Sequence, residues 1–519
     1  MSRPMRMDYR SFTTAMNLSQ KVDNYRLEAS RKLDPQRRSA LGQFMTPEPV
    51  ARFMASLFGD WSGNKMRLLD AGAGVGSLTA AFIAEICQHS THPDRIGSTV
   101  YELEPALIGY LDNTLEACRQ TCQSVGIHFI SKLLQEDFIH AGSERLVHDL
   151  FSNAGEESLY THVILNPPYK KIHSLSDHRL RLRAIGVETS NLYTAFLAIA
   201  IKLLETGGEL VAITPRSFCN GPYFKPFRTL FLNTMTLRRI HVFEERDQAF
   251  KEDEVLQENI IFHAIKGAGR GDVTISVSRG LDIADMSIQE VAYTTVIKPD
   301  DPDCFIHIAT NAVNRNLVER MGKFRYSLDE LGIQVSTGPV VDFRLKECLR
   351  ASPEPGTVPL IYPTHFRHNF IIWPKSDSRK PNAILDTEIS HKWLMPNGYY
   401  TVVRRFSAKE ERRRVVAAVH DPMQVIGENI GFENHLNIFH RRGAGLPPLL
   451  AKGLAVYLNS TLVDVYFRQF NGHTQVNASD LRMLRYPGQA ILERLGSHVS
   501  ADVFPRQDEI DALLERELE

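Results

Sequence analysis

Apolar and polar positions follow two alternating periods over residues 66–215, and the pattern predicts strands separated by helices. Short apolar runs that end in an acid, a glycine or a proline are typical of buried strands. Longer segments with apolar residues at helical spacing lie between them. The expected strands are 66–72, 98–105, 127–134, 160–169 and 208–215, and the expected helices are 78–88, 106–122 and 191–208.

This alternation predicts an α/β fold built on a doubly wound, Rossmann-like, mostly parallel sheet. In such a sheet the first and fourth strands are usually neighbours at the switch point where ligands bind. A late strand is expected at 258–266. Beyond about residue 270 the alternation stops and apolar clusters become short, which indicates a second, mixed α/β domain.

The length of 519 residues exceeds that of one ordinary domain. We expect a basic arm over residues 1–40, the doubly wound domain over 41–320 and the mixed domain over 321–519. Lys and Arg outnumber Asp and Glu by nine to four in the arm and by 22 to 15 in residues 321–487. Basic regions around a neutral core suit a polyanion-binding protein, although an ordinary solvated surface explains them equally well.

Several classes of protein are not expected from the composition. The sequence contains no run of about 18 apolar residues, so no transmembrane helix is expected. The first twenty residues also lack the apolar core of a secretory signal. The six cysteines lack paired CxxC spacing, so reduced thiols are expected rather than a zinc site. A cytoplasmic protein with no membrane partner follows from these features.

A glycine-rich loop follows the first expected strand. Gly72, Gly74 and Gly76 permit a tight turn and close approach of a ligand to the backbone. The G-x-G-x-G spacing, with no following Lys-Ser/Thr, matches neither a P-loop nor the dinucleotide fingerprint well. Asp70 directly before the loop suits a positively charged small cofactor better than a pyrophosphate.

Acids also end the next two expected strands. Glu102 could accept both hydroxyls of a ribose, and Asp137 with Phe138 could meet an adenine amino group and ring. Each acid alone is often only a strand-end residue. At the ends of three consecutive strands, together with the glycine loop, they predict a pocket for S-adenosylmethionine.

The stretch Asn166-Pro-Pro-Tyr169 follows the fourth expected strand. Two prolines cannot continue a strand, because they lack N–H donors. The Asn166 side-chain oxygen and the Pro167 carbonyl can each accept one N–H bond of a conjugated amine and stabilise the charge it gains on attacking a methyl group. Tyr169 can stack on the ring and fix the line of attack. A base inside a duplex would have to be extruded, and Phe262 is a candidate second stacking ring, although a core position fits it as well.

Six short motifs occur in a fixed order along the chain: GQFMTP (42–47), DAGAGVGSLT (70–79), YELEP (101–105), EDF (136–138), NPPY (166–169) and NLYTAFL (191–197). In this order they resemble the gamma-class DNA adenine-N6 methyltransferases of type II restriction–modification systems, particularly the BsuBI/PstI kind. The glycine loop reads A-G-A-G-V-G and departs slightly from the commonest D-P-A-C-G-S-G form.

The resemblance assigns roles to individual residues and implies no metal, because methyl transfer from a sulfonium needs no Lewis acid. The cofactor would contact four groups of residues, listed here in order along the chain. The first two groups would hold its methionine, the third its ribose and the fourth its adenine. These groups are Gln43, Phe44, Thr46 and Pro47; Asp70, Ala71, Gly72 and Gly74; Glu102; and Asp137 with Phe138. Asn166, Pro167, Pro168 and Tyr169 would be catalytic.

The resemblance also implies that residues 41–320 form the methyltransferase domain and residues 321–519 a DNA target-recognition domain. Double-stranded DNA would be a partner, and a cognate restriction endonuclease is compatible with this family. Residues 458–487 are similar to recognition domains, and four short polar side chains there suit base edges or phosphates. These are His473, Thr474, Gln475 and Asn477.

Other activities could use the same catalytic motif. A protein-glutamine methyltransferase also acts on an sp² nitrogen, but such enzymes look about half as long, which leaves the second domain unexplained. An RNA adenine methyltransferase would more often carry an RNA module before the catalytic domain. A catalytically silent DNA-binding subunit would not need both an intact NPPY and a glycine loop.

Overall fold

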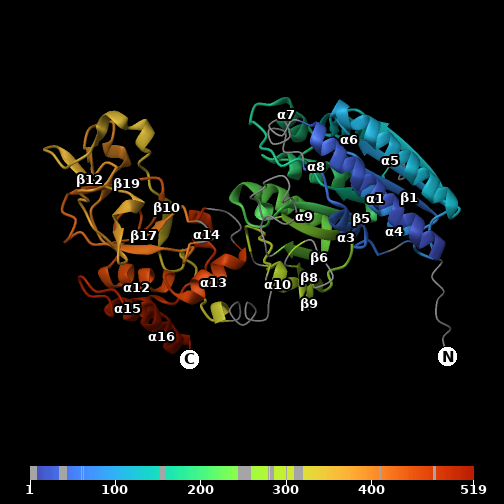
Figure 1. Ribbon diagram of the computed structural model, residues 1–519. Helices are drawn as coiled ribbons and strands as arrows, with labels where there is room; N and C mark the ends of the chain where they lie inside the picture. The colour runs from blue at the N-terminus through green and yellow to red at the C-terminus, as the bar shows by residue number, and fades with distance from the viewer. Residues whose placement is uncertain are drawn as a thin grey trace. The chain divides into compact units, whose positions relative to one another are not determined.

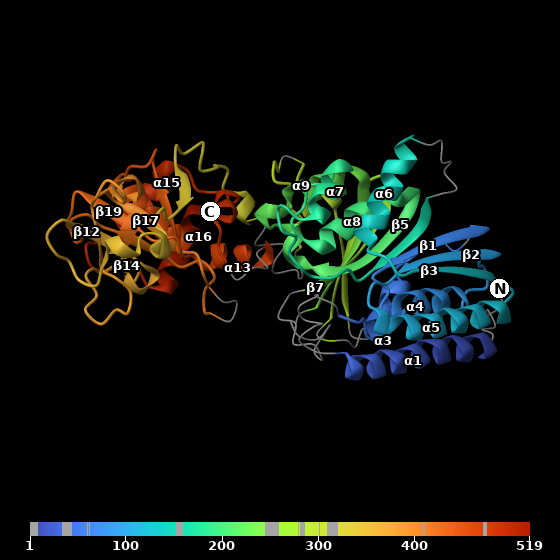
Figure 2. The ribbon, with the colours of Figure 1, turned by 90° about the horizontal axis from the view of Figure 1, so that it is seen from above.

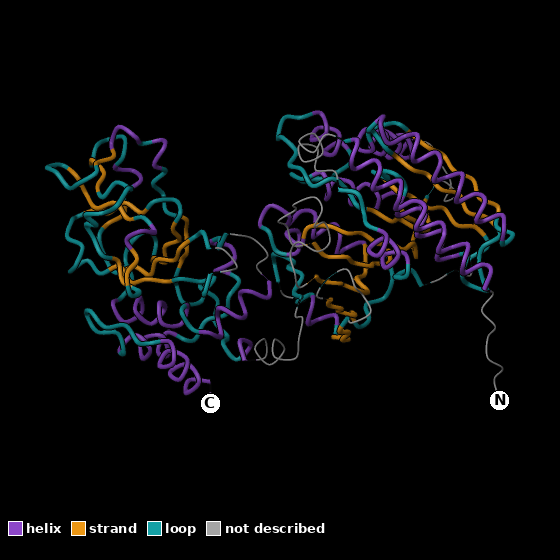
Figure 3. Tube along the Cα trace, viewed as in Figure 1, coloured by secondary structure: helices purple, strands orange, loops and turns teal. Residues whose placement is uncertain are grey.

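The computed structural model describes most of the chain and divides it into two compact units, residues 1–310 and 311–519. Figures 1 and 3 show the elements of both units. No helix of the described residues is long and apolar enough to cross a membrane. The described residues are 9–33, 44–59, 61, 63–151, 159–243, 259–278, 280, 286–299, 301–308, 320–407, 411–470 and 475–518.

The first unit is built on a nine-stranded sheet of order β3-β2-β1-β4-β5-β7-β6-β8-β9. Strands β3, β2, β1, β4 and β5 are parallel, whereas β7 runs antiparallel to both of its neighbours. The predicted mostly parallel sheet and the pairing of the first and fourth strands are confirmed. The bounds are β1 Lys65–Ala71, β2 Arg95–Tyr101, β3 His128–Leu134, β4 Tyr160–Leu165, β5 Leu204–Pro215, β6 Met235–Phe243, β7 Asn259–Lys266, β8 Val273–Ser278 and β9 Ser287–Val291.

Helices cover both faces of this sheet, as Figure 2 shows. Helices α1, α3, α4 and α5 share a hydrophobic core with one face. Helices α6, α7, α8, α9 and α10 share the core of the other face. Their bounds are α1 Tyr9–Lys32, α3 Glu48–Ala55, α4 Ser77–Ile86, α5 Pro105–Ser124, α6 Phe138–Phe151, α7 Asp177–Ala184, α8 Leu192–Leu203, α9 Lys225–Thr234 and α10 Tyr293–Val296.

Part of the expected basic arm is instead a helix of the first unit. Leu18, Val22 and Ala29 of α1 are buried against the core of this unit. Asp23 Oδ1 accepts a hydrogen bond from the N–H of Glu48 at the start of α3, at 3.2 Å. The prediction of a separate arm is therefore corrected for residues 9–32, because one apolar helix face outweighs the basic composition.

One predicted boundary is also wrong. The helix expected to run to residue 208 ends at Leu203, and strand β5 begins at Leu204. The pairing of β4 with β5 shifts register between Tyr160 and His162. This irregularity accommodates Gly207 within the strand, with φ of 83°, so this glycine does not end the helix as predicted.

The second unit contains two small sheets and five described helices. A six-stranded sheet has the order β10-β20-β17-β18-β14-β13, and a five-stranded sheet has the order β11-β15-β12-β19-β16. Apolar residues from both sheets form one core, and the helices pack on the six-stranded sheet to form another. The strands are β10 Gln334–Thr337, β11 Leu349–Arg350, β12 Thr357–Ile361, β13 Phe366–Arg367, β14 Phe370–Ile371, β15 Ala383–Leu385, β16 Met395–Pro396, β17 Tyr400–Arg404, β18 Ala417–His420, β19 Asn429–Phe432 and β20 Leu436–His440, and the helices are α12 Pro448–Leu458, α13 Thr461–Phe470, α14 Ala478–Arg482, α15 Gln489–Ser497 and α16 Gln507–Leu518.

Two glycines allow helices α12 and α15 to touch through their backbones. A Cβ atom on Gly453 would lie 1.7 Å from the carbonyl oxygen of Leu492. A Cβ atom on Gly496 would lie 1.9 Å from the carbonyl oxygen of Leu449. Because neither contact leaves room for a methyl group, the crossing of these helices depends on both glycines.

We predict that Gly453→Ala destabilises the second unit by about 1–3 kcal/mol or more, the usual cost of overpacking. Urea unfolding of the full chain followed by circular dichroism measures this change. Gly322→Ala is the matched control, since nothing lies within 4 Å of the added methyl group. Equal stability of the two variants would contradict the close crossing.

Candidate active site

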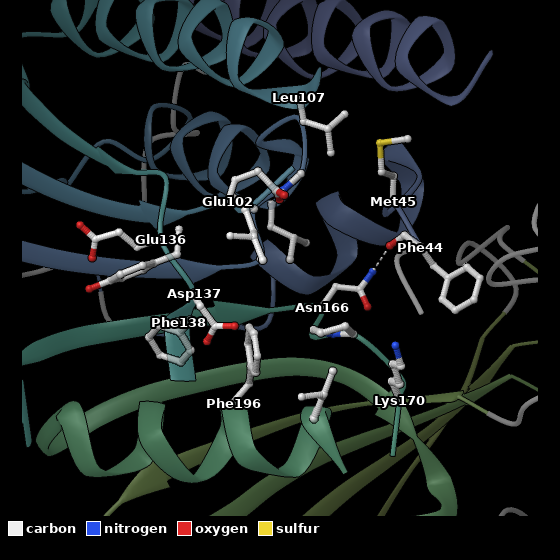
Figure 4. Close-up of a pocket in the computed structure, with 18 of the residues that line it drawn as sticks. Phe44, Met45, Glu102, Leu107, Glu136, Asp137, Phe138, Asn166, Lys170 and Phe196 are labelled. Carbon is white, nitrogen blue, oxygen red and sulfur yellow. Dashed lines mark hydrogen bonds between the residues drawn. The ribbon is translucent and has the colours of Figure 1, made fainter. Parts of the chain in front are cut away.

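A cavity of about 340 Å³ opens at the carboxyl ends of β1, β2, β3 and β4 (Figure 4). The loops that follow these four strands provide most of its wall, and the segment before α3 closes one side. Parallel strands place their carboxyl ends at one edge of a sheet, so these distant segments meet there. The wall includes Phe44, Met45, Thr46, Gly72, Gly74, Glu102, Leu107, Glu136, Asp137, Phe138, Asn166, Pro168, Lys170, His178 and Phe196.

The glycine loop after β1 takes a conformation that other residues rarely adopt. Gly72, Gly74 and Gly76 have φ angles of 78°, 60° and 86°. A Cβ atom on Gly76 would also lie 2.8 Å from Cγ2 of Thr114. The N–H of Gly72 donates to the carbonyl oxygen of Tyr101 at 2.8 Å, which ties the loop to the end of β2. The loop therefore turns tightly along the cavity wall.

Glu102 joins the glycine loop to the second strand. Its side chain is 4% exposed and lines the cavity. One carboxylate oxygen accepts the N–H of Gly74 at 2.8 Å, and the other accepts the N–H of Glu104 at 2.7 Å. Burial raises the pKa of Glu102, although these backbone hydrogen bonds oppose the shift. Each carboxylate oxygen keeps acceptor capacity for a ligand hydroxyl.

Asp137 lies at the start of α6 and faces the cavity. Its Oδ1 accepts the N–H groups of Ile139 at 2.8 Å and His140 at 3.1 Å, which caps the helix. Its Oδ2 lies 3.0 Å from Nε2 of His178. Burial would raise the pKa of Asp137, but the hydrogen bond and charge of His178 together with the N–H of His140 hold it below its ordinary value. This carboxyl group is therefore an anion at neutral pH.

Aromatic rings line the same end of the cavity. Phe138 is 2% exposed, and its ring lies 5.0 Å from Tyr101 and 5.1 Å from Phe196 between centroids. Phe196 comes from α8 and also lines the cavity. These rings offer an apolar surface beside the Asp137 carboxylate, an arrangement that suits a flat heterocycle with an amino group.

The amide of Asn166 has a fixed orientation. Its Nδ2 donates to the carbonyl oxygen of Phe44 at 2.7 Å (dashed in Figure 4) and to Oγ1 of Thr46 at 3.0 Å. A backbone carbonyl can only accept, so the NH₂ group must face Phe44. The Oδ1 atom is therefore left as the hydrogen-bond acceptor of this side chain.

Tyr169 supports Asn166 and does not line the cavity in this structure. Its hydroxyl is 3.2 Å from Oδ1 of Asn166 and 3.3 Å from the carbonyl oxygen of Ile213. Its ring centroid lies 5.8 Å from that of Phe44. Burial raises the pKa of the phenol far above its ordinary value. The ring would have to leave this position before stacking on a substrate.

Several residues expected at the site do not line the cavity. Asp70 is fully buried, because β1 continues through Ala71 and places Asp70 within the strand. It accepts a hydrogen bond from Oγ1 of Thr79 at 2.7 Å, and burial raises its pKa to about 7. The prediction that Asp70 lies beside the cofactor is therefore corrected. Ala71, Pro47 and Pro167 also do not line the cavity, and Gln43 lies outside the described residues.

Of the two alternatives expected for Phe262, a ring that stacks on the substrate or a core residue, the structure confirms the core position. Phe262 lies in β7 and is 1% exposed. Its ring packs 5.7 Å from Phe218 and 5.4 Å from Phe231 between centroids. The strand was expected correctly, but the sequence pattern did not fix which face of the sheet would receive this ring.

Two of the expected recognition residues are described. Gln475 is partly buried, and its Oε1 lies 3.5 Å from Nη2 of Arg405. Asn477 caps α14, where its N–H and Nδ2 both donate to Oδ2 of Asp480 at 2.8 and 3.2 Å. The cap fixes the position of the Asn477 amide, and its role in base contact stays a prediction. His473 and Thr474 lie outside the described residues.

Other wall residues were not singled out from the sequence. Lys170 follows the NPPY motif directly, and its position after two prolines was a usable signal. Met45 lies inside the range 43–47 that was expected at the methionine end of the cofactor, and Phe196 lies inside the NLYTAFL motif without an assigned role. Leu107 and His178 carry no signal in the sequence, since only the packing of α5 and α7 brings them to the cavity.

Comparisons with known proteins indicate the family of this chain. Residues 108–250 match the profile of the family described as Eco57I restriction-modification methylase. The chain is 45% identical to the type II methyltransferase M.PstI of Providencia stuartii, covering 96% of this chain and 97% of that protein. It is 46% identical to the type II methyltransferase M.BsuBI of Bacillus subtilis, with coverage of 95% and 97%.

A solved structure shares the fold over nearly the whole chain. It is the type IIL restriction-modification enzyme MmeI in complex with DNA, at a TM-score of 0.50 and 10% identity, covering 97% of this chain and 73% of that one. At that identity the likeness concerns the fold alone. The close sequence relatives decide the family: the chain belongs to the type II restriction–modification methyltransferases of the PstI and BsuBI kind.

Proposed function

We propose that the protein transfers the methyl group of S-adenosylmethionine to the N6 amino group of an adenine extruded from duplex DNA. The modification would protect DNA from a cognate restriction endonuclease. The observation that carries the proposal is the fixed amide of Asn166 at the wall of the cavity, with its oxygen left as the acceptor.

The chemistry of an adenine amine explains this arrangement. The nitrogen lone pair is delocalised into the ring, so the amine is a poor nucleophile. Asn166 Oδ1 would accept one of its N–H bonds and stabilise the charge that develops on nitrogen. The Pro167 carbonyl would accept the other after a local shift, since Pro167 does not line the cavity in this structure. The hydrogen bonds from Asn166 to Phe44 and Thr46 hold the acceptor in place before the substrate arrives.

The residues present fit the proposed cofactor. A nucleoside amino group would meet Asp137, whose carboxylate is ionised and partly exposed at the cavity. Ribose hydroxyls would meet Glu102, and the amino-acid end would lie near the glycine loop and Thr46. When bound, S-adenosylmethionine supplies an electrophilic methyl group on a sulfonium. The chain contributes binding, orientation and the acceptors for the target amine.

The second unit is proposed to recognise the target sequence. Family membership supports DNA over the RNA and protein-glutamine substrates that the catalytic motif alone would allow. Gln475 and Asn477 stay predicted base-contacting residues, and Asn477 also caps α14. Mapping N6-methyladenine after expression in methylation-free cells tests the activity as a whole. A single recurring methylated motif supports it, and an unmodified genome overturns it.

Asn166→Ala should lower the single-turnover rate of DNA methylation by about 10²–10³, the usual effect of removing one such electrostatic contact. Cofactor affinity should change little, since Asn166 is proposed to act on the amine. Rapid-quench methylation of a duplex and a calorimetric cofactor titration measure the two effects. An undiminished rate would remove Asn166 from the mechanism.

Thr46→Val keeps the shape of the side chain but removes the acceptor for one Asn166 N–H. If Thr46 positions the catalytic amide, kcat should fall about two- to tenfold, the value of one ordinary hydrogen bond. The KM for cofactor should stay nearly constant. A raised KM with unchanged kcat would instead limit Thr46 to cofactor binding. Thr46→Ser, which retains the hydroxyl, is the control and should keep the native kcat.

Glu102→Gln should weaken S-adenosylmethionine binding about 10- to 100-fold, because hydrogen bonds to a charged group contribute about 1.5–3 kcal/mol. Calorimetry on the purified full chain measures the change. Glu136→Gln is the matched control, since this acid also lines the cavity but has no proposed ligand contact. Equal losses in both variants would indicate a general charge effect and move the ribose elsewhere.

A further inference from the structure

Three side chains converge beside the cavity, and two of them are imidazoles with no part in the proposed methyl transfer. Asp137, His140 and His178 each present one possible ligand atom, and these atoms all lie within 4.8 Å of one another. The first two come from the start of α6 and the third from α7. The imidazole rings of His140 and His178 lie 5.1 Å apart between centroids. Asp177 adds a second carboxylate, with Oδ2 3.0 Å from Nε2 of His140.

The donor set suits a transition metal ion. Imidazole nitrogen is a preferred ligand of Zn²⁺ and Ni²⁺, whereas Mg²⁺ prefers oxygen alone. Around a tetrahedral Zn²⁺ with bonds of about 2.0–2.2 Å, donor atoms lie roughly 3.4 Å apart. The ligand atoms of the cluster all lie within 4.8 Å of one another, so a small movement of the side chains would bring them to tetrahedral spacing. The side chains of Asp137, His140 and His178 are 27%, 40% and 31% exposed, so an ion can reach them from solvent.

We propose that Asp137, His140 and His178 form a binding site for a divalent transition metal ion, with Zn²⁺ as the probe, and that an occupied site weakens cofactor binding. The metal site itself stands on the geometry of the cluster. Its effect on the cofactor rests on the proposed function, since Asp137 is the residue proposed to meet the adenine amino group.

The existing hydrogen bonds are compatible with this role. Oδ1 of Asp137 caps α6, and only Oδ2 turns toward His178. The metal would replace the contact between Oδ2 and His178 and leave the helix cap intact. With Oδ2 coordinated, Asp137 loses its acceptor for an amino group. His178 lines the cavity as well, so the ion would sit beside the space proposed for the adenine.

His140 allows a clean test, because it does not line the cavity. Calorimetric titration of the full-length protein with ZnCl₂ should show one saturable site. His140→Ala should weaken it by more than about 100-fold, beyond the 10- to 100-fold that loss of an outer partner costs. MgCl₂ in excess should not compete.

The matched control is His391→Ala. His391 also pairs with a carboxylate, 2.7 Å from Asp386, and its side chain is 65% exposed. Within the described residues this pair belongs to no group of three metal-ligating side chains, so the variant should bind Zn²⁺ like the native chain. Unchanged Zn²⁺ affinity in His140→Ala, or no saturable binding to the native protein, overturns the metal site.

The second arm measures S-adenosylmethionine affinity with and without saturating Zn²⁺. The native chain should bind the cofactor at least tenfold more weakly with Zn²⁺ and recover when EDTA is added. His140→Ala should show native affinity under both conditions. Zn²⁺ binding without an effect on the cofactor would overturn the coupling. A native, metal-free protein that binds no cofactor would instead refute the proposed function and leave the ZnCl₂ result standing.

Discussion

The hydrogen bond from the Asn166 amide to the Phe44 carbonyl decides which hydrogen-bonding group the proposed catalytic site presents to a substrate. An amide can present either oxygen or NH₂ to a substrate, and only a partner with one possible role removes that choice. The carbonyl of Phe44 can only accept, at 2.7 Å. The NH₂ group is thereby committed, and the oxygen becomes the acceptor. An amine donor can use that arrangement, whereas an oxygen acceptor on a substrate cannot.

The orientation of the Asn166 amide also depends on the first described helix of the chain. Phe44 and Thr46 precede α3, whose first N–H donates to Asp23 of α1. Helix α1 in turn is buried against the core through Leu18 and Val22. A segment that was expected from its composition to be a basic arm therefore supports the segment that orients Asn166.

The sequence predicted the parallel sheet and the pairing of its first and fourth strands. The spacing of apolar residues and the residues that end each strand are local properties, so they can be read from the sequence. It also placed Gly72, Gly74, Glu102, Asp137, Phe138 and Asn166, which the structure brings to one cavity. It failed where packing decides the outcome. Asp70 lies within β1 and is buried against Thr79 of α4, so it does not line the cavity. His178 lines the cavity only because of the placement of α7.

The two carboxylates of the cavity have structural as well as proposed ligand roles. Glu102 accepts the N–H groups of Gly74 and Glu104, and Asp137 accepts those of Ile139 and His140. These bonds hold each anion in a fixed place before any ligand binds, which lowers the ordering cost of binding. They also mean that deleting either acid would loosen a loop or a helix end. Replacing either acid by its amide keeps one acceptor oxygen in place, so it disturbs this support less than truncation to alanine does.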